Sequence, residues 1–183
     1  MNKTSKIILQ RKRVLGLIAI MIIMVLGLGN LASAADQGKI LVTITEDLKK
    51  NNDGECSLRE AIIAANKDAK SGSTGNECDA GDGADVIVLE AGKVYTLSRT
   101  DSGNEDSSQT GDLDIAEGSE VTIQTDEPGI VVIQGDDNFT DRIFHVLPGG
   151  KLTIEDITIR KGNVRDIGGG FYNGGGTLDL TNV

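Results

Sequence analysis

A six-residue pattern recurs along the sequence and limits the folds that this chain can adopt. Four segments contain glycine, two variable residues, a hydrophobic residue, Thr or Asp, and a second hydrophobic residue. A second element recurs as IVVIQG and DITIRKG. Short strands and glycine turns repeated at this interval are typical of a solenoid. The four segments read GKVYTL from Gly92, GSEVTI from Gly118, GGKLTI from Gly149 and GGTLDL from Gly175, so their glycines are 26, 31 and 26 residues apart.

Three other architectures compete with a stack of coils. Leucine-rich repeats have a similar length but need regularly spaced leucines and an asparagine, which these segments lack. Propeller blades are longer. An antiparallel sandwich is the strongest competitor, because the segments alternate well and turns are frequent. One signature at intervals of 26 to 31 residues suits stacked coils better than hairpins. The sequence therefore predicts an all-β fold, a right-handed parallel β-helix of three or four incomplete coils.

The expected strands are short and rich in β-branched residues. One begins at Ile40, and the others span 86–89, 94–97, 121–124, 130–134, 143–147 and 152–160. The side chains that we expect to face the core are Val86, Val88, Leu97, Val121, Ile123, Val132, Ile154, Ile157 and Ile159.

The segment CSLREAIIAAN, residues 56–66, is the one convincing helix in the sequence. Ser57 followed three residues later by Glu60 is a capping box, in which each side chain bonds the backbone N–H of the other residue. Hydrophobic residues at helical spacing then form one apolar stripe. A helix this short barely forms alone in water. We therefore expect a helix over 58–69 that covers the first coil and caps the end of the β-helix.

The first residues have the pattern of an export signal. Five basic residues precede an apolar run from Val14 to Leu28, and small residues before Ala34 and Ala35 mark a cleavage site. The run falls short of the about 20 apolar residues of a spanning helix, so an uncleaved anchor is the weaker interpretation. We therefore predict that residues 1–34 are removed. The mature charge is then 13 − 28 = −15, and so acidic a protein is expected to bind neither nucleic acid nor the membrane surface.

Cys56 and Cys78 are the only cysteines in the chain. In an oxidising compartment after export they are candidates for a disulfide, which would stabilise the fold by about 3 kcal/mol on the chain-entropy estimate. A metal site built on these thiols is disfavoured, because the one histidine, His145, lies far along the chain.

The opening segment CSLREAIIAAN resembles the CSLREA domain, an N-terminal module of exported bacterial proteins that precedes β-helix repeats of the pectin-lyase type. The resemblance continues through GDGADVIVLEAGKVYTL, TGDLDI, RIFHVLPGGKLTIEDITIRKGN and GGGFYN. It implies a secreted or surface-attached bacterial protein with a cap over residues 35–85 and the first coils over 86–183. Because GGTLDLTNV stops inside a coil, it also implies the N-terminal fragment of a longer protein. We expect such a fragment to self-associate.

The sequence contains no constellation that we recognise as catalytic. A pectate lyase needs an arginine base beside aspartates that hold calcium. The candidates are Arg142, Arg160 and Arg165, with Asp136, Asp137, Asp141, Asp156 and Asp166 near them. Charged residues in turns are usually solvated. We expect His145 to be a surface or edge residue rather than a catalyst.

The sequence identifies no cofactor, although one loop partly matches a calcium-binding motif. The loop NNDGECSLRE is a near miss for an EF-hand, with Asn51, Asp53 and Glu60 at ligand positions but Lys49 at the first. Two hypotheses for function follow. One is a non-catalytic exported scaffold or surface adhesion module that binds a polysaccharide or another cell-surface ligand. The alternative is a polysaccharide-active enzyme of the pectate-lyase type.

Overall fold

The structure is a computed structural model that describes residues 38–75, 77–100, 105–165 and 167–183. The predicted signal over residues 1–34, including the cleavage site at Ala34 and Ala35, lies outside the described residues. Residues Gln37–Val183 form one compact unit. In the described part of the chain, no helix has both the length and the apolar character needed to cross a bilayer.

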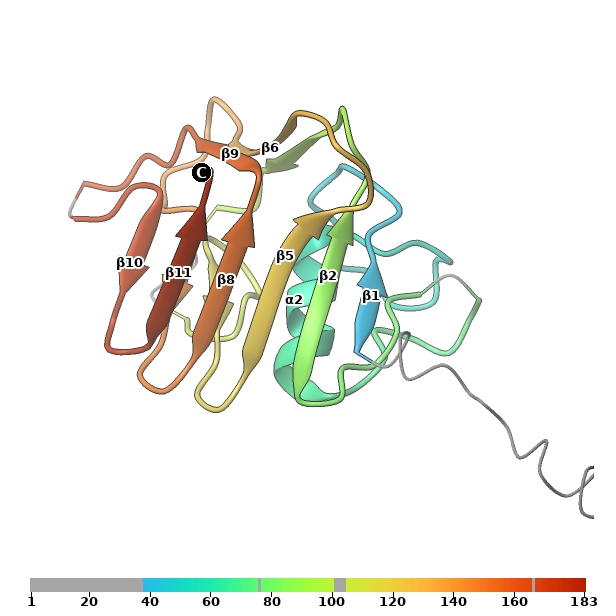
Figure 1. The fold of residues 1–183 in the computed structure, drawn as a ribbon. Coiled ribbons are helices and arrows are strands. Elements are labelled where there is room, and N and C mark those ends of the chain that lie inside the picture. The colour runs from blue at the N-terminus through green and yellow to red at the C-terminus, as the bar shows by residue number, and fades with distance from the viewer. Residues whose placement is uncertain (1–37, 76, 101–104, 166) are drawn as a thin grey trace, which may run out of the picture. The chain divides into compact units, whose positions relative to one another are not determined.

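The described residues fold mostly as strands in parallel sheets, with one short helix among them (Figure 1). A five-stranded first sheet has the order β1-β2-β5-β8-β11, and all its pairings are parallel. The three-stranded second sheet, β3-β6-β9, and third sheet, β4-β7-β10, are also parallel. These pairings exclude the antiparallel sandwich for the described residues. The elements are β1 (Lys39–Leu41), α2 (Leu58–Lys67), β2 (Ala84–Leu89), β3 (Val94–Leu97), β4 (Leu113–Ile115), β5 (Glu120–Thr125), β6 (Val131–Gly135), β7 (Phe144–Val146), β8 (Lys151–Glu155), β9 (Ile157–Arg160), β10 (Phe171–Asn173) and β11 (Thr177–Thr181).

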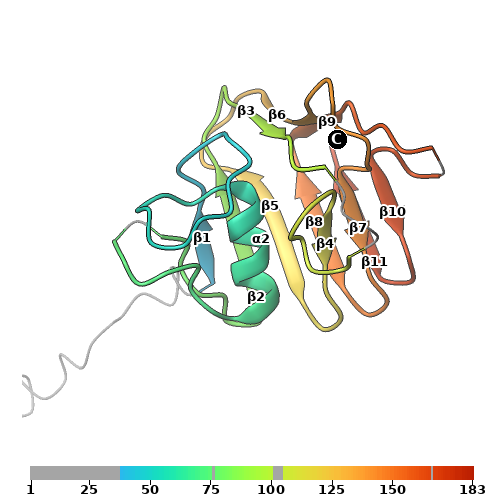
Figure 2. The same cartoon turned by 180° about the vertical axis from the view of Figure 1, so that it is seen from behind.

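Successive strands from β2 onward lie in the first, second and third sheets in turn, and the cycle repeats through β11 (Figure 2). Backbone turns with positive φ separate them, as at Gly118 and Gly149. The single strand predicted over 152–160 is wrong. Asp156 adopts a left-handed conformation with φ 56° and divides this run into β8 and β9, which lie in different sheets.

The alignment of the four glycine segments is wrong at its first member. The segments from Gly118, Gly149 and Gly175 form β5, β8 and β11 of the first sheet, whereas the segment from Gly92 forms β3 of the second. The strand equivalent to β5 is β2, because its Ile87 pairs with Ile123. A glycine turn followed by an alternating strand occurs at more than one corner of the fold, so this pattern alone does not fix the sheet.

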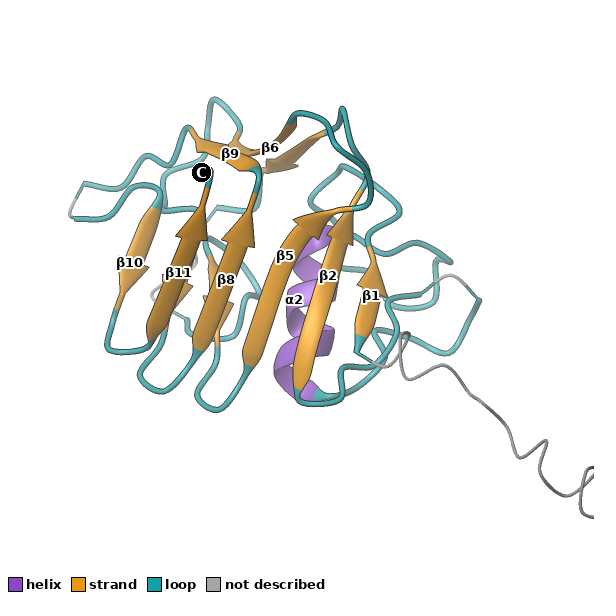
Figure 3. Ribbon diagram, viewed as in Figure 1, coloured by secondary structure: helices purple, strands orange, loops and turns teal. Residues whose placement is uncertain are grey.

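Figure 3 shows helix α2 beside β2 and β5 of the first sheet. The core lies between the sheets and is built from ladders of aliphatic side chains. In the first sheet, Ile40, Ile87, Ile123 and Ile154 pair in sequence and are fully buried. The predicted inward positions Leu97, Val121, Ile123, Ile154 and Ile157 are confirmed, and Ile159 packs partly buried against the core.

The predicted inward positions Val86, Val88 and Val132 lie outside the core cluster, although Val88 and Val132 are buried and Val86 is half-buried. Their neighbours Ile87, Leu89, Val131 and Ile133 belong to the core. Because side chains alternate along a strand, the predicted residues point away from it. Where three or four β-branched residues follow one another, alternation cannot choose between the two faces.

Helix α2 begins at Leu58 as predicted and ends at Lys67, followed by Asp68 in a left-handed conformation. Its apolar stripe is buried, and the helix contacts β1, β2, β4 and β5. Two residues bond the backbone of edge strands at this end of the fold. The Asn66 carboxamide donates to the carbonyl of Asp114 (2.7 Å) and accepts from the N–H of Ala116 (3.0 Å), in the place of a neighbouring strand of β4. The backbone of Glu46 forms an isolated parallel β-bridge with Thr96 of β3.

Candidate functional site

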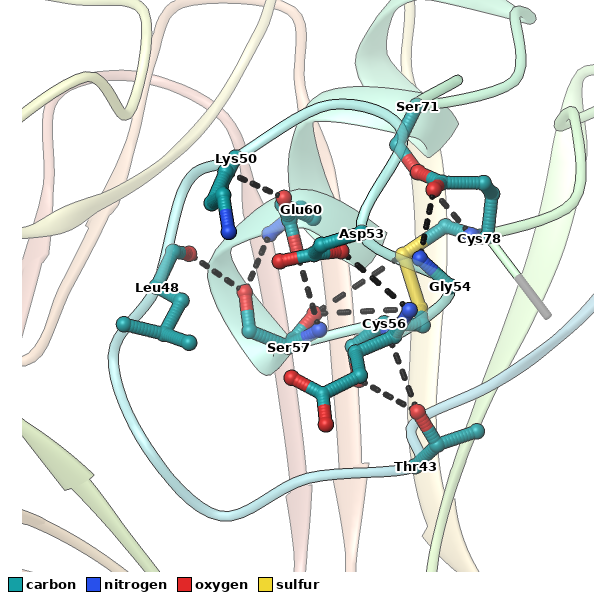
Figure 4. Close-up of a disulfide and its surroundings, with 12 residues drawn as sticks. Thr43, Leu48, Lys50, Asp53, Gly54, Cys56, Ser57, Glu60, Ser71 and Cys78 are labelled. Carbon is teal, nitrogen blue, oxygen red and sulfur yellow. Dashed lines mark hydrogen bonds between the residues drawn. A yellow bond between two sulfur atoms is a disulfide. The ribbon is translucent and has the colours of Figure 1, made fainter. Parts of the chain in front are cut away.

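The predicted disulfide and capping box are both confirmed (Figure 4). Cys56 and Cys78 are bonded, with their α-carbons 4.9 Å apart, and both are fully buried. The Ser57 side chain accepts from the N–H of Glu60, and the Glu60 carboxylate accepts from the N–H of Ser57 (3.0 Å) and of Lys50 (2.7 Å). Both Glu60 oxygens are therefore engaged, which leaves this carboxylate unsuited to the EF-hand role considered above.

A second carboxylate orders the loops beside the disulfide. Glu77 accepts from the Thr74 hydroxyl (2.5 Å), the Gly54 N–H (2.9 Å) and the Ser71 hydroxyl (3.1 Å). These bonds, the Thr74 bond first, lower the pKa of Glu77 to about 2. The negative charge of Glu77 therefore ties Ser71 and Thr74 to Gly54, in the loop that precedes the helix.

The most deeply buried charge of the cap is Arg59, to which the sequence analysis gave no role. Its side chain and that of Asp47 are fully buried, and they form a two-point ion pair with N–O distances of 2.6 and 3.0 Å. The remaining guanidinium hydrogens bond the carbonyls of Ser108 (3.1 Å), Gly111 (2.7 Å) and Asp112 (3.2 Å). All five N–H donors are thus used, which is the condition for burying this group.

Arg59 and Asn66 therefore fix the segment that leads into β4. That strand begins a polar ladder on the side of the third sheet that faces away from the core. Asp114 pairs with His145 of β7, and His145 pairs with Tyr172 of β10. The neighbouring residues Leu113, Ile115, Phe144 and Val146 belong to the core, and Phe171 packs against it. We call the outward side chains of Asp114, His145 and Tyr172, with Arg142 beside them, the polar face.

Asp114 is the buried acid of the polar face. Its side chain is fully buried under the segment 105–112, and its Oδ2 accepts from the N–H of Ser108 (2.8 Å). Its Oδ1 has no hydrogen-bond partner. Burial, together with the charges of Glu105 and Asp106, raises the pKa of Asp114 to about 7. One oxygen of the Asp114 carboxyl group is therefore hydrogen-bonded, and the other has no hydrogen-bond partner.

His145 lies between two acids. Its Nδ1 is 3.3 Å from Oδ1 of Asp114 and 3.7 Å from Oδ1 of Asp106, and its ring centre is 5.1 Å from that of Tyr172. Burial and the charge of Arg142 lower its pKa, so the imidazole is neutral at pH 7. His145 faces away from the core, but it does not lie on an edge strand, because β7 is the central strand of its sheet, and its side chain is only 15% exposed.

Arg142 completes the polar face. Its guanidinium carbon lies 4.8 Å from the ring centre of Tyr172, and its Nε is 3.5 Å from Asp112 and 3.7 Å from Asp141. Nε is buried and makes no hydrogen bond. Among the described residues, this nitrogen and Oδ1 of Asp114 are the buried side-chain atoms without a hydrogen-bond partner, and both belong to the polar face.

The other charged residues singled out from the sequence do not join this site. Arg160 donates to Gln134 and Asp137 pairs with Lys161, both at exposed positions. Asp136 accepts from the N–H of Asn138, and Asp156 accepts from Asn182. Arg165 is exposed, and Asp166 lies outside the described residues. Of the candidates, only Arg142 and Asp141 contribute to the polar face.

A surface hollow of about 560 Å³ lies elsewhere, beside the turn between β5 and β6. Two of its three acids are occupied by local bonds, since Asp126 accepts from the N–H of Ala91 and Asp156 from the Asn182 side chain, and the third, Glu127, is exposed. Because none of these acids has a buried oxygen without a partner, the polar face is the better candidate for a ligand site.

The residue spacing contains a signal for the polar face that the sequence analysis missed. Asp114, His145 and Tyr172 are 31 and 27 residues apart, which matches the repeat interval. Comparison with protein-family models, curated proteins and solved structures found no match to this chain.

Proposed function

We propose that this chain is exported and folds as a capped right-handed parallel β-helix that acts as a non-catalytic scaffold or surface binding module. The observation that supports this proposal best is the order in which the strands occupy three parallel sheets, cycle after cycle. Parallel strands that return to the same sheet after two others form the coils of a β-helix. The resemblance of residues 56–66 to the CSLREA module agrees with the proposal, and the buried disulfide suits an oxidising compartment.

The polar face is the proposed ligand site of this module, and a polysaccharide is the proposed ligand. The face combines the half-buried ring of Tyr172 with an unsatisfied acceptor on Asp114 and an unsatisfied donor on Arg142. A sugar hydroxyl both donates and accepts hydrogen bonds, so one class of ligand can satisfy both atoms. The apolar faces of sugar rings pack on aromatic side chains in the same way as other apolar surfaces.

The alternative function, a polysaccharide lyase, has weaker support. It would need Arg142 as the base, since no other candidate arginine lies beside the polar face. The guanidinium is placed between two carboxylates and against an aromatic ring. Arginine is in general the side chain least able to release a proton, which makes it a poor base.

Measurements of polysaccharide binding and of polysaccharide cleavage distinguish the two proposed functions. The mature protein is to be tested for retention on immobilised acidic and neutral polysaccharides, alongside Tyr172→Ala and Arg142→Gln. The matched control is Asp137→Ala, an acid 92% exposed and outside the polar face. We expect retention that both site variants weaken and the control does not, with no new reducing or unsaturated sugar ends. Retention equal in all variants refutes the site, and turnover that Arg142→Gln removes establishes the lyase instead.

Self-association remains the expected behaviour of this chain on its own. The strands β9, β10 and β11 each lie at an edge of their sheet, and Leu180 of β11 is 45% exposed. Unpaired edges of this kind pair readily with other chains. We expect light scattering to give a mass that rises with protein concentration, and a constant monomer mass would contradict this.

A further inference from the structure

Three potential metal ligands converge at one end of the polar face. They are Oδ1 of Asp106, Oδ1 of Asp114 and Nδ1 of His145, and the ligand atoms of these residues all lie within 4.8 Å of one another. They come from separate parts of the chain, since Asp106 precedes β4, Asp114 is the central residue of β4, and His145 belongs to β7. The fold, rather than a local sequence motif, brings them together.

The unsatisfied oxygen of Asp114 points to a ligand independently of this clustering. The Asp114 side chain is fully buried, and its Oδ1 lies 3.3 Å from Nδ1 of His145 without a hydrogen bond. A buried carboxylate oxygen with no partner is costly, and such groups in native proteins commonly face a bound ion or water. The oxygen is directed at the space that the other two ligand atoms border.

We propose that Asp106, Asp114 and His145 bind one divalent transition-metal ion, with Zn²⁺ as the best-matched probe. In a tetrahedral zinc site with bonds of about 2.0–2.1 Å, neighbouring ligand atoms are about 3.3–3.4 Å apart. The observed separations from His145 to the two acids are 3.3 and 3.7 Å. The side chain of Asp106 is 64% exposed, so it can adjust without disturbing the core.

The ligand types decide which ion fits. One imidazole nitrogen with two carboxylates suits zinc and its first-row neighbours, whereas calcium takes six to eight oxygens. Two positive charges act on these ligands: that of Arg142, which is paired with Asp112 and Asp141, and that of Arg59, which is paired with Asp47. Three protein ligands leave the fourth position of zinc open for water or an oxygen of a ligand. The metal site shares Asp114 with the proposed polysaccharide site, but it involves neither Arg142 nor Tyr172 as a ligand, so the variants that test polysaccharide retention leave the metal ligands in place.

His145 makes the test direct, because it is the only histidine in the sequence. Untagged mature protein, stripped with EDTA, is titrated with Zn²⁺ at constant pH by calorimetry and by NMR of the ¹⁵N-labelled imidazole. We expect one ion per chain and a large shift of the His145 Nδ1 resonance that saturates at the same ratio. Ca²⁺ at the same concentration should leave the resonance in place.

Two variants and one control complete the design. Asp106→Asn removes an exposed ligand and His145→Gln removes the imidazole, and each should weaken Zn²⁺ binding at least tenfold. Asp137→Asn, also exposed and acidic, should leave it unchanged. A normal circular dichroism spectrum for each variant shows that it has folded. Binding that is absent in the wild-type protein, or equally tight in Asp106→Asn and Asp137→Asn, refutes the site, as does an unmoved His145 resonance.

Discussion

Replacement of Arg59 by Met tests whether the buried ion pair holds the cap to the rest of the fold. Met keeps most of the side-chain volume, so the change removes charge and hydrogen bonds with little loss of packing. The Asp47 carboxylate would stay fully buried, with only the N–H groups of Ser98 and Arg99 as donors. Three carbonyls in the segment 108–112 would lose their donor. Removing one partner of a buried ion pair costs about 3–5 kcal/mol.

Equilibrium unfolding in urea measures this cost, with Lys70→Met as the matched control. Lys70 forms an exposed ion pair with Asp79, in which the side chains are 62% and 64% exposed. Pairs of this kind contribute about 0–1 kcal/mol. With a urea dependence of about 1–3 kcal/mol/M, Arg59→Met should lower the midpoint by at least about 1 M and Lys70→Met by a small fraction of that. Equal shifts of the two midpoints would refute the reasoning that Arg59 anchors the cap.

Three further predictions concern polar groups of the cap and first coil. Asn66→Leu should lower the free energy of unfolding by about 1–3 kcal/mol in urea titrations, because the carbonyl of Asp114 in β4 and the N–H of Ala116 just after it lose their partner. Because the folded-state pKa of Glu77 is about 2, below its ordinary value of 4.5, its stabilisation is complete above pH 4.5 and lost as the pH falls toward 2. Thermal unfolding between these values should therefore show a smaller acid-induced fall for Glu77→Gln than for the wild-type protein. Burial raises the pKa of Asp85, so the wild-type protein loses stability as the pH rises above the ordinary carboxyl range, and Asp85→Asn should lose less in the same melts.

The sequence predicted the cap better than the sheets, because the evidence for the cap is local. The capping box needs two residues three positions apart, and the helix needs one apolar stripe. To predict the sheets, it was necessary to decide which face of each strand is buried. Along Val86–Leu89 every residue is aliphatic, so the alternation of side chains does not show which face is buried. Val86 was predicted to face the core, but Ile87 is the core residue. In β5, where Thr122 separates two aliphatic residues, the prediction was correct.

The polar face was missed because its strands give almost no periodic signal. Each strand of the third sheet has three residues, and two of them, β4 and β10, were not among the predicted strands. The prediction for His145 used only its own segment, in which it lies between Phe144 and Val146. Its partners Asp114 and Tyr172 are one repeat away in either direction. Only a comparison of outward positions across repeats would have aligned the three.

The residues of the cap explain why one short helix can organise a polar site on a sheet of strands. Arg59 and Asn66 are seven residues apart, which places them on one side of the helix, two turns from each other. Arg59 binds carbonyls of the segment 108–112, and Asn66 binds the backbone on both sides of Ile115. The chain between these anchors includes Asp114 and the serine that bonds it, so the helix fixes the strand that supplies the buried acid. An apolar helix would cover the same core surface, but it would leave these backbone groups unpaired and Asp114 without a fixed position. The two polar residues on an otherwise apolar side of the helix therefore connect the cap to the proposed ligand site.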